Sequence, residues 1–183
     1  TEARVRRRAQ LFYQQLDILQ ALRQELRRDL LAESGKQSGT KWLRQIPCIG
    51  PIRAALLIAL IQTPDRFRTK RQLWAYSGLG LETHGSAEYR YQQGQLQRSK
   101  KAVALRGLNK NHNRDLKSIF KSAATKGSSS PGPLREFYEA LLAKGMKPSM
   151  ARLTLARKIA TITLTVWKKG AHFDAQRVKP QAA

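Results

Sequence analysis

Residues 3–33 contain neither glycine nor proline, and leucine, arginine, glutamine and glutamate dominate them. These residue types favour helix, and nothing inside the run would end one. Five apolar residues follow steps of four, three, seven and four positions, which is close to a coiled-coil seam: Phe12, Leu16, Leu19, Leu26 and Leu30. We therefore predict a long, coiled-coil-like helix over residues 1–35, which either pairs with a second copy or packs on its own domain.

The residues after this helix predict a separate, mainly helical domain. Glycine and serine over 33–39 indicate a flexible joint. Apolar or amphipathic segments then predict helices at 51–61, 69–77, 109–125, 134–142 and 148–169, with a loop at 126–133 and an extended or frayed tail from His172. The expected fold is mainly α, with residues 40–183 forming one domain that contains a helix–hairpin–helix and a short basic β-hairpin or loop.

Charge sets the class of partner. The 183 residues include 35 Lys and Arg against 12 Asp and Glu, a net charge of +23. An imbalance this large opposes compaction unless a polyanion neutralises it, so nucleic acid is the expected partner. The sequence contains no run of about 18 uncharged apolar residues, the length needed to span a membrane. Its charged N-terminus is unlike a signal peptide. The chain lacks an initiator Met, which predicts a piece of a longer or processed protein, and its single cysteine, Cys48, fits a reducing cytosol.

A tight turn is expected between two apolar helices. The run Ile46-Pro47-Cys48-Ile49-Gly50-Pro51 places a flexible glycine before a proline that suits the first position of a helix. The amides at the start of that helix could hold a phosphate, aided by the helix dipole. Gly50 is therefore a candidate phosphate contact, although a purely structural hairpin explains the same residues.

Basic residues crowd the middle of the chain. Apolar and basic residues alternate over 88–106, which predicts a basic β-hairpin or mobile arm with its tip near Gly94. Between Arg98 and Lys126 there are nine Lys or Arg and one acid, Asp115, which favours a nucleic-acid surface over a merely solvated face. The candidate contacts are Arg90, Arg98, Lys100, Lys101, Arg106, Lys110, Arg114, Lys117 and Lys121.

One serine in this basic region is a candidate nucleophile. Ser86 lies in the loop Gly78–Ala87 among small residues, where it is either an ordinary loop serine or a hydroxyl aimed at a phosphodiester. Metal binding by this chain is not expected, because its three histidines are scattered and Cys48 is solitary. Phosphodiester chemistry here would therefore use a nucleophilic side chain, with nearby cations neutralising the charge on the phosphorane.

Several motifs taken together resemble one family of transposases. They are the turn at residues 46–51, Phe67-Arg68, the run Leu73–Leu79, Ser86, and Gly107-Leu108-Asn109-Lys110 with Asn113. Their order and spacing resemble the insertion-sequence family called IS-one-ten, the bridge-RNA-guided recombinases. The resemblance covers residues 40–125 and continues more loosely through Leu134–Tyr138 and Ala156-Arg157-Lys158 to Phe173-Asp174.

The resemblance implies that this chain is the C-terminal part of a bacterial, nucleoid-associated transposase of the cytoplasm. Such enzymes join a RuvC-like domain, which binds Mg²⁺, to a transposase domain whose serine attacks DNA and forms a phosphoserine intermediate. The matching serine is Ser86, and no cofactor is expected in this chain itself. The implied partners are donor and target DNA, a structured guide RNA, the RuvC-like domain and at least one more copy of the protein, which would pair through residues 3–33.

The sequence departs from the family pattern at defined places. The family's Pro-Gly-Ile-Gly turn has Cys48 at its first glycine, Leu81 replaces a usual proline, and Ala87 replaces the glycine that follows the serine. The interval from Ser86 to Gly107 is also long, which leaves Ser77 and Ser99 as alternative nucleophiles. Two other classes fit the sequence: a non-catalytic helix–hairpin–helix module that binds structured DNA or RNA, and an assembly segment that dimerises a larger protein.

Overall fold

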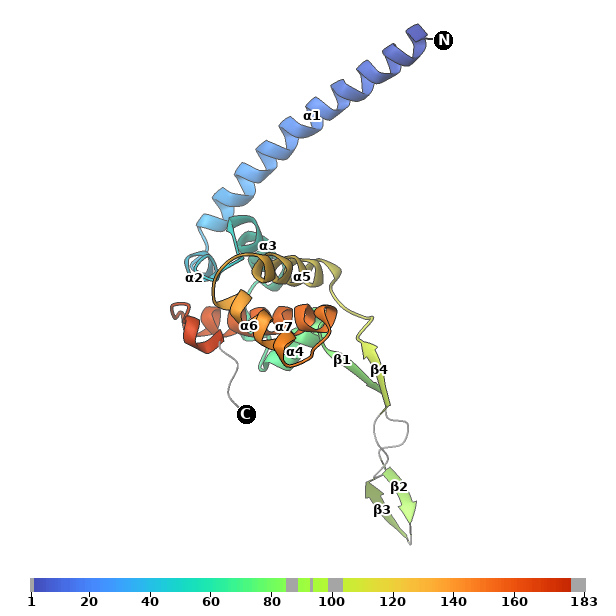
Figure 1. The fold of residues 1–183 in the computed structure, drawn as a ribbon, viewed down its shortest axis with the longest axis vertical. Helices are drawn as coiled ribbons and strands as arrows, with labels where there is room; N and C mark the ends of the chain where they lie inside the picture. The colour runs from blue at the N-terminus through green and yellow to red at the C-terminus, as the bar shows by residue number, and fades with distance from the viewer. Residues whose placement is uncertain (1, 85–88, 93, 99–103, 179–183) are drawn as a thin grey trace.

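The computed structural model describes residues 2–84, 89–92, 94–98 and 104–178 (Figure 1). The described residues form a helical body, a long helix that leaves it on one side, and a narrow β arm that leaves it on the other. The mainly α fold expected from the sequence is confirmed. No described helix has the length and apolar character needed to cross a membrane.

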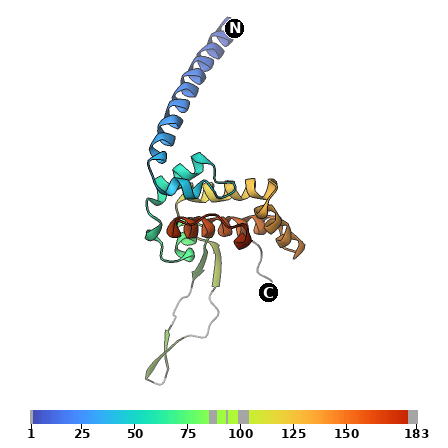
Figure 2. The ribbon, with the colours of Figure 1, turned by 90° about the vertical axis from the view of Figure 1, so that its left-hand side faces the viewer.

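The N-terminal helix α1 spans Glu2–Gly35 and stands clear of the body over most of its length (Figures 1 and 2). The single helix predicted over residues 1–35 is thus confirmed, with the same C-terminal end. Phe12, Leu16, Leu19 and Leu26 are all exposed, by 47–67%. Only the end of α1 meets the body, where Ser34 is buried and α1 contacts α3. The described part of the body therefore leaves the apolar seam of α1 uncovered.

Helix α7, Pro148–Lys169, runs through the centre of the body. It contacts α2, α4, α5, α6 and η1, and α5 lies beside it while α4 lies on its opposite side (Figures 1 and 2). The other elements of the body are α2 Gly39–Leu43, α3 Pro51–Ile61, η1 Pro64–Arg66, α4 Lys70–Tyr76, α5 Arg114–Ser129, α6 Pro133–Ala143 and η2 Ala175–Val178. The predicted helix at 109–125 in fact begins at Arg114, where Asn113 caps it, and continues to Ser129 through part of the predicted loop.

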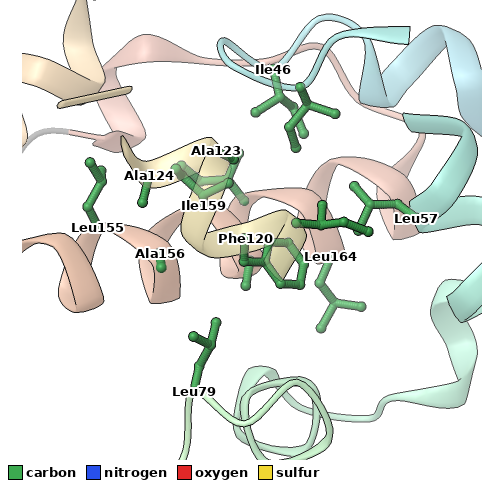
Figure 3. Close-up of a cluster of buried hydrophobic side chains, with 14 of the residues drawn as sticks. Ile46, Leu57, Leu79, Phe120, Ala123, Ala124, Leu155, Ala156, Ile159 and Leu164 are labelled. Carbon is green, nitrogen blue, oxygen red and sulfur yellow. The ribbon is translucent and has the colours of Figure 1, made fainter. Parts of the chain in front are cut away.

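The core lies where α3, α5 and α7 meet (Figure 3). Leu57, Phe120 and Ile159 come from these three helices and are fully buried, and Leu79 closes the core from the loop after α4. Within a helix the buried residues recur at the helical period seen in the sequence, so the apolar face of the helix was predictable. Which helices pack against one another was not predictable. Burial of such side chains supplies most of the favourable free energy of folding.

The turn between α2 and α3 has an unexpected strained residue. Gly50 is extended, with φ −75° and ψ 177°, and caps α3 at Pro51. The left-handed conformation falls instead on Cys48, with φ 70°. Because glycine adopts this conformation at little cost, Cys48 stands at the position in the turn where the backbone favours glycine. Arg53 compensates in part, since its Nη1 donates to the Cys48 carbonyl at 3.0 Å.

The arm consists of two antiparallel strand pairs. At its base, β1 Leu81–His84 pairs with β4 Ala104–Leu108, and further along the chain β2 Tyr89–Gln92 pairs with β3 Gln95–Arg98. The predicted basic hairpin is therefore present, with Gly94 at its turn in a left-handed conformation. The predicted loop Gly78–Ala87 is corrected, because Leu81–His84 forms a strand by pairing with a partner more than twenty residues away, which no local pattern reveals.

The chain also returns to the body after α7. Gly170, with φ 54°, ends α7 in a left-handed cap. The predicted frayed tail is wrong for the residues that follow, because η2 packs on α6 and Val178 is fully buried. Burial of Val178 and packing of Phe173 against the core hold this segment, which is named the return segment below and covers residues 171–178.

Candidate nucleic-acid interface

The first strand of the arm is fixed to the end of α4. Gly78 ends that helix in a left-handed conformation, and a Cβ on it would overlap the ring of His112. The amides of Leu79 and Gly80 both donate to the Trp74 carbonyl at 2.8 Å. The chain thus reverses direction within three residues, in a space that only glycine fits at position 78.

The second strand of the arm returns to the same helix. The amide of Asn109 donates to the Gly80 carbonyl at 3.0 Å, and its side-chain Nδ2 donates to the Ala75 carbonyl at 3.2 Å. The amide of Asn113 donates to the Tyr76 carbonyl at 2.8 Å, while its Oδ1 accepts from the Leu116 amide and begins α5. Both ends of the arm are therefore hydrogen-bonded to the last turn of α4.

A third contact joins this arm base to α7. Trp74 Nε1 donates to the Arg157 carbonyl at 3.1 Å, and Arg157 Nε donates to the Leu79 carbonyl at 2.7 Å. The guanidinium also lies 6.0 Å from the centre of the Trp74 ring, within the range of a cation–π contact. Burial lowers the pKa of Arg157, and its Nη2 is buried with no partner among the described residues. A charged side chain is thus held in a costly position and fixes the first turn of the arm.

Helix α5 presents the second group of predicted residues. Leu116, Ile119, Phe120 and Ala123 face the core, whereas the basic side chains lie on the opposite face. Lys110, Arg114 and Lys121 are exposed, and Lys117 is half-buried beside His112, with Nζ 3.3 Å from Nε2. None of these four cations pairs with a carboxylate of a described residue. Such a row of unpaired cations suits the regular charge of a phosphate backbone.

The far end of α5 meets the turn that holds Gly50. Arg53 Nε donates to Ser122 Oγ at 3.2 Å, and a cavity of about 150 Å³ lies between the turn and the loop that follows α5. Cys48 and Lys126 both line this cavity. Burial raises the pKa of the Cys48 thiol, although Arg53 and Lys126 lower it in part, so the thiol is neutral at pH 7 and is not an activated nucleophile.

The structure places the predicted site residues in two groups. Gly50 lies at one end of α5, with Lys110, Arg114, Lys117 and Lys121 before and along the helix. Arg90, Arg98 and Arg106 belong to strands β2, β3 and β4 of the arm. Ser86, Ser99, Lys100 and Lys101 lie outside the described residues. The α5 group and the arm group meet at Asn109–Asn113, where the arm ends and α5 begins.

Of the alternative serines, Ser77 has a structural position. It is fully buried, and its Oγ donates to the Leu73 carbonyl at 2.7 Å. A hydroxyl that closes its own helix and is shielded from solvent does not meet a DNA strand. The described residues also contain no group of three or more His, Cys, Asp or Glu side chains that could hold a metal ion.

Sequence reasoning missed the role of Arg157. The signal was present, because Arg157 and Lys158 interrupt the run of small and branched residues in the middle of α7, between the buried Ala156 and Ile159. A partly buried cation requires a specific acceptor. The acceptor is the Leu79 carbonyl, 78 residues earlier, and that contact is not readable from the sequence.

Comparison with known families assigns a class to this arrangement. Residues 40–106 match the model of a transposase family, so the class that the match supports is transposase. The matching model is that of the transposase IS116/IS110/IS902 family, and the match runs from α2 to β4. It therefore includes the turn at Gly50, α4 and most of the arm. No curated protein matches the chain.

We expect replacement of Arg157 to loosen the arm base. Arg157→Met removes the hydrogen bond to Leu79 but keeps much of the side-chain volume, and losing such a bond costs about 1–3 kcal/mol. Amide hydrogen exchange at Leu79, Gly80 and Asn109 should become faster. Arg152→Met is the matched control, because Arg152 is exposed on the same helix. Equal exchange in the two variants would show that Arg157 does not hold the arm.

Proposed function

We propose that this chain is the C-terminal part of a DNA transposase that cuts and rejoins DNA through Ser86. The match of residues 40–106 to a transposase family carries the proposal, and it implies DNA as a partner. The motif resemblance adds the finer parts: a phosphoserine intermediate, a structured guide RNA and a RuvC-like domain outside this chain. It also implies that Mg²⁺ binds in that other domain, and no step here is assigned to a metal.

The fold supports this role through the way it anchors the arm. Ser86 follows β1 by two residues, and β1 starts from the turn that Trp74 and Arg157 fix. In the proposed step the Ser86 oxygen forms a bond to a DNA phosphorus while one backbone P–O bond breaks and its oxygen leaves as a hydroxyl. A hydroxyl of another strand then attacks the phosphoserine and releases the serine. The number of phosphoester bonds is unchanged.

A non-catalytic module that binds structured nucleic acid is the second candidate. The unpaired cations of α5 favour it, since phosphate binding accounts for them without any reaction. The two candidate functions differ only in what Ser86 does, so detection of a covalent adduct between Ser86 and DNA would distinguish them.

Replacing Ser86 should abolish the reaction and spare binding. In the full-length protein, with RNA and Mg²⁺ present, we expect Ser86→Ala to lose strand exchange and to bind nucleic acid nearly as well as the wild type. A lost nucleophile removes the covalent step, whereas a lost loop hydroxyl costs little stability. The measurement is a protease-resistant DNA–peptide adduct mapped by mass spectrometry.

Ser86→Cys and Ser77→Ala are the controls for that experiment. A thiol can retain a trace of attack where alanine cannot, and Ser77→Ala removes a buried hydroxyl that holds α4 together. An adduct on another serine, or exchange by Ser86→Ala, would refute the assignment of Ser86 while the transposase class could stand.

Removing charge from α5 should weaken binding and its salt dependence. For each cation that contacts a phosphate, the slope of log affinity against log salt changes by about 0.9. The double variant Lys117→Gln, Lys121→Gln should therefore flatten the slope by about 1.8 and weaken DNA of all sequences alike. Lys144→Gln, exposed at the end of α6, is the control. An unchanged slope would exclude α5 from the interface.

Pairing of α1 between two copies is also proposed. The exposed seam of α1 has no cover in the described part of the chain, and a second α1 would supply one. The double variant Leu16→Gln, Leu19→Gln should be monomeric by light scattering under conditions where the wild type is at least dimeric. Ile18→Gln changes an equally exposed residue off the seam and should keep the wild-type mass. A monomeric wild type would contradict pairing.

A further inference from the structure

A groove lies between helix α7 and the return segment, on a part of the body that none of the predicted contacts occupies. Its volume is about 150 Å³. Lys158, Thr161, Ile162 and Thr165 line it from α7, at spacings that put them on one helical face. No residue of α5 or of the described arm contributes to it. It is called the α7 groove below.

The floor of the α7 groove is apolar. Ile162 and Val166 form it with Ala171. The hydroxyls of Thr161 and Thr165 donate to the carbonyls of Arg157 and Thr161, both at 2.9 Å, so the α7 wall offers methyl groups and oxygen acceptors. A cavity of about this volume is enough for one benzene-sized ring in another protein. The floor therefore suits one planar aromatic ring.

An aromatic side chain stands at the rim. His172 packs edge-on against Trp42, with ring centres 5.4 Å apart, and its Nδ1 lies 2.9 Å from Gln45 Oε1. Because an amide oxygen only accepts, Nδ1 donates the hydrogen bond and the imidazole orientation is fixed. A fixed ring beside an apolar floor is a stacking surface for a nucleobase.

Two cations line the groove from different segments. Lys158 lines it from α7, with its Nζ 5.6 Å from the centre of the Phe137 ring, and Arg177 lines it from the return segment. Burial lowers the pKa of Lys158, and the charge of Lys70, on α4, lowers it further. No carboxylate of a described residue pairs with either lysine. A bound anion stabilises the charged form of a lysine in such a place.

The acidic side chain that lines the groove, Asp174, already has an ion-pair partner and a hydrogen-bond partner. Asp174 Oδ2 lies 3.3 Å from Arg177 Nε, and Oδ1 accepts from the Gln176 amide at 2.9 Å. Asp174 therefore shapes the return segment and orients Arg177. Asp174 is therefore not a counter-ion for Lys158 or Lys70, and helix α7 contains no acidic residue that could be one.

We propose that the α7 groove binds one unpaired nucleotide of a nucleic-acid strand, with the base on the apolar floor beside His172 and the flanking phosphates on Lys158 and Arg177. One ring with a phosphate on either side matches an apolar floor that has a cation on α7 and another on the return segment. The site is separate from the α5 surface and does not depend on Ser86 as a nucleophile. The chemistry is shared by RNA and DNA, so the experiment includes both.

The test compares a base with its absence. The 183-residue chain is titrated with a short duplex carrying one unpaired uracil in RNA, or one unpaired thymine in DNA, and with the same duplexes carrying an abasic residue there. We expect the base to improve affinity about five- to tenfold in at least one of the two series. The series that shows the gain identifies the kind of strand. A ratio near one in both series would overturn the proposal.

Variants then locate the effect. Thr165→Met fills the groove from α7 and should reduce the base-to-abasic ratio to near one. If thermal melting shows that this variant does not fold, Ala171→Leu fills the groove from the return segment and should have the same effect. Lys168→Gln, exposed on the same helix, should weaken both probes alike and keep the ratio. Ser86→Ala should also keep it, so this test and that of the proposed function fail independently. A ratio that survives in both filled variants would place the base elsewhere.

Discussion

The packing of helix α7 is the interaction on which the rest of the body depends. Nine of its residues are buried, and they meet α2, α4, α5 and α6 as well as the short helix η1. A helix buried on most of its circumference must match each neighbour at once, so a change of volume at Ile159 or Leu155 would be felt by several elements. The arm base and the α7 groove are both attached to this helix, through Arg157 and Lys158, which are neighbours in sequence but serve different contacts.

Charge works against the same packing. The net charge of +23 belongs to a chain whose described ion pairs are few and exposed: Arg6–Glu2, Lys36–Glu33, Arg135–Glu139 and Arg177–Asp174. Exposed pairs of this kind contribute little stability. A ligand that binds only the folded chain stabilises it by an amount that rises with the logarithm of its concentration over its dissociation constant. A polyanion on α5 or on the arm would thus relieve repulsion that the protein does not relieve by itself.

The sequence predicted what depends on local chemistry. The absence of glycine and proline over 3–33 was sufficient for α1, and the alternation around Gly94 was sufficient for the β2–β3 hairpin. Contacts between distant residues were not readable. Strand β1 depends on β4, and the return segment depends on the burial of Val178. The tight first turn was attributed to the flexibility of Gly50, whereas the positive φ of the turn falls on Cys48, whose carbonyl accepts a hydrogen bond from Arg53.

In the candidate site, too, the local features were predictable from the sequence and the long-range contacts were not. The basic face of α5 followed from a helical period, and the structure shows Arg114 and Lys121 exposed on it, with Lys117 half-buried and Lys110 before the helix. The arm base did not follow, because its hydrogen bonds join α4 to residues 30 or more positions later and α7 to residues nearly 80 positions earlier. These bonds have a consequence for any chemistry carried by the arm. Both of its ends are tied to one turn of α4, and α4 is tied to α7 through Trp74, so bending the arm at its base would break several backbone bonds together. The body and the start of β1 therefore behave as one unit, and the last turn of α4 fixes where the first strand of the arm leaves the body.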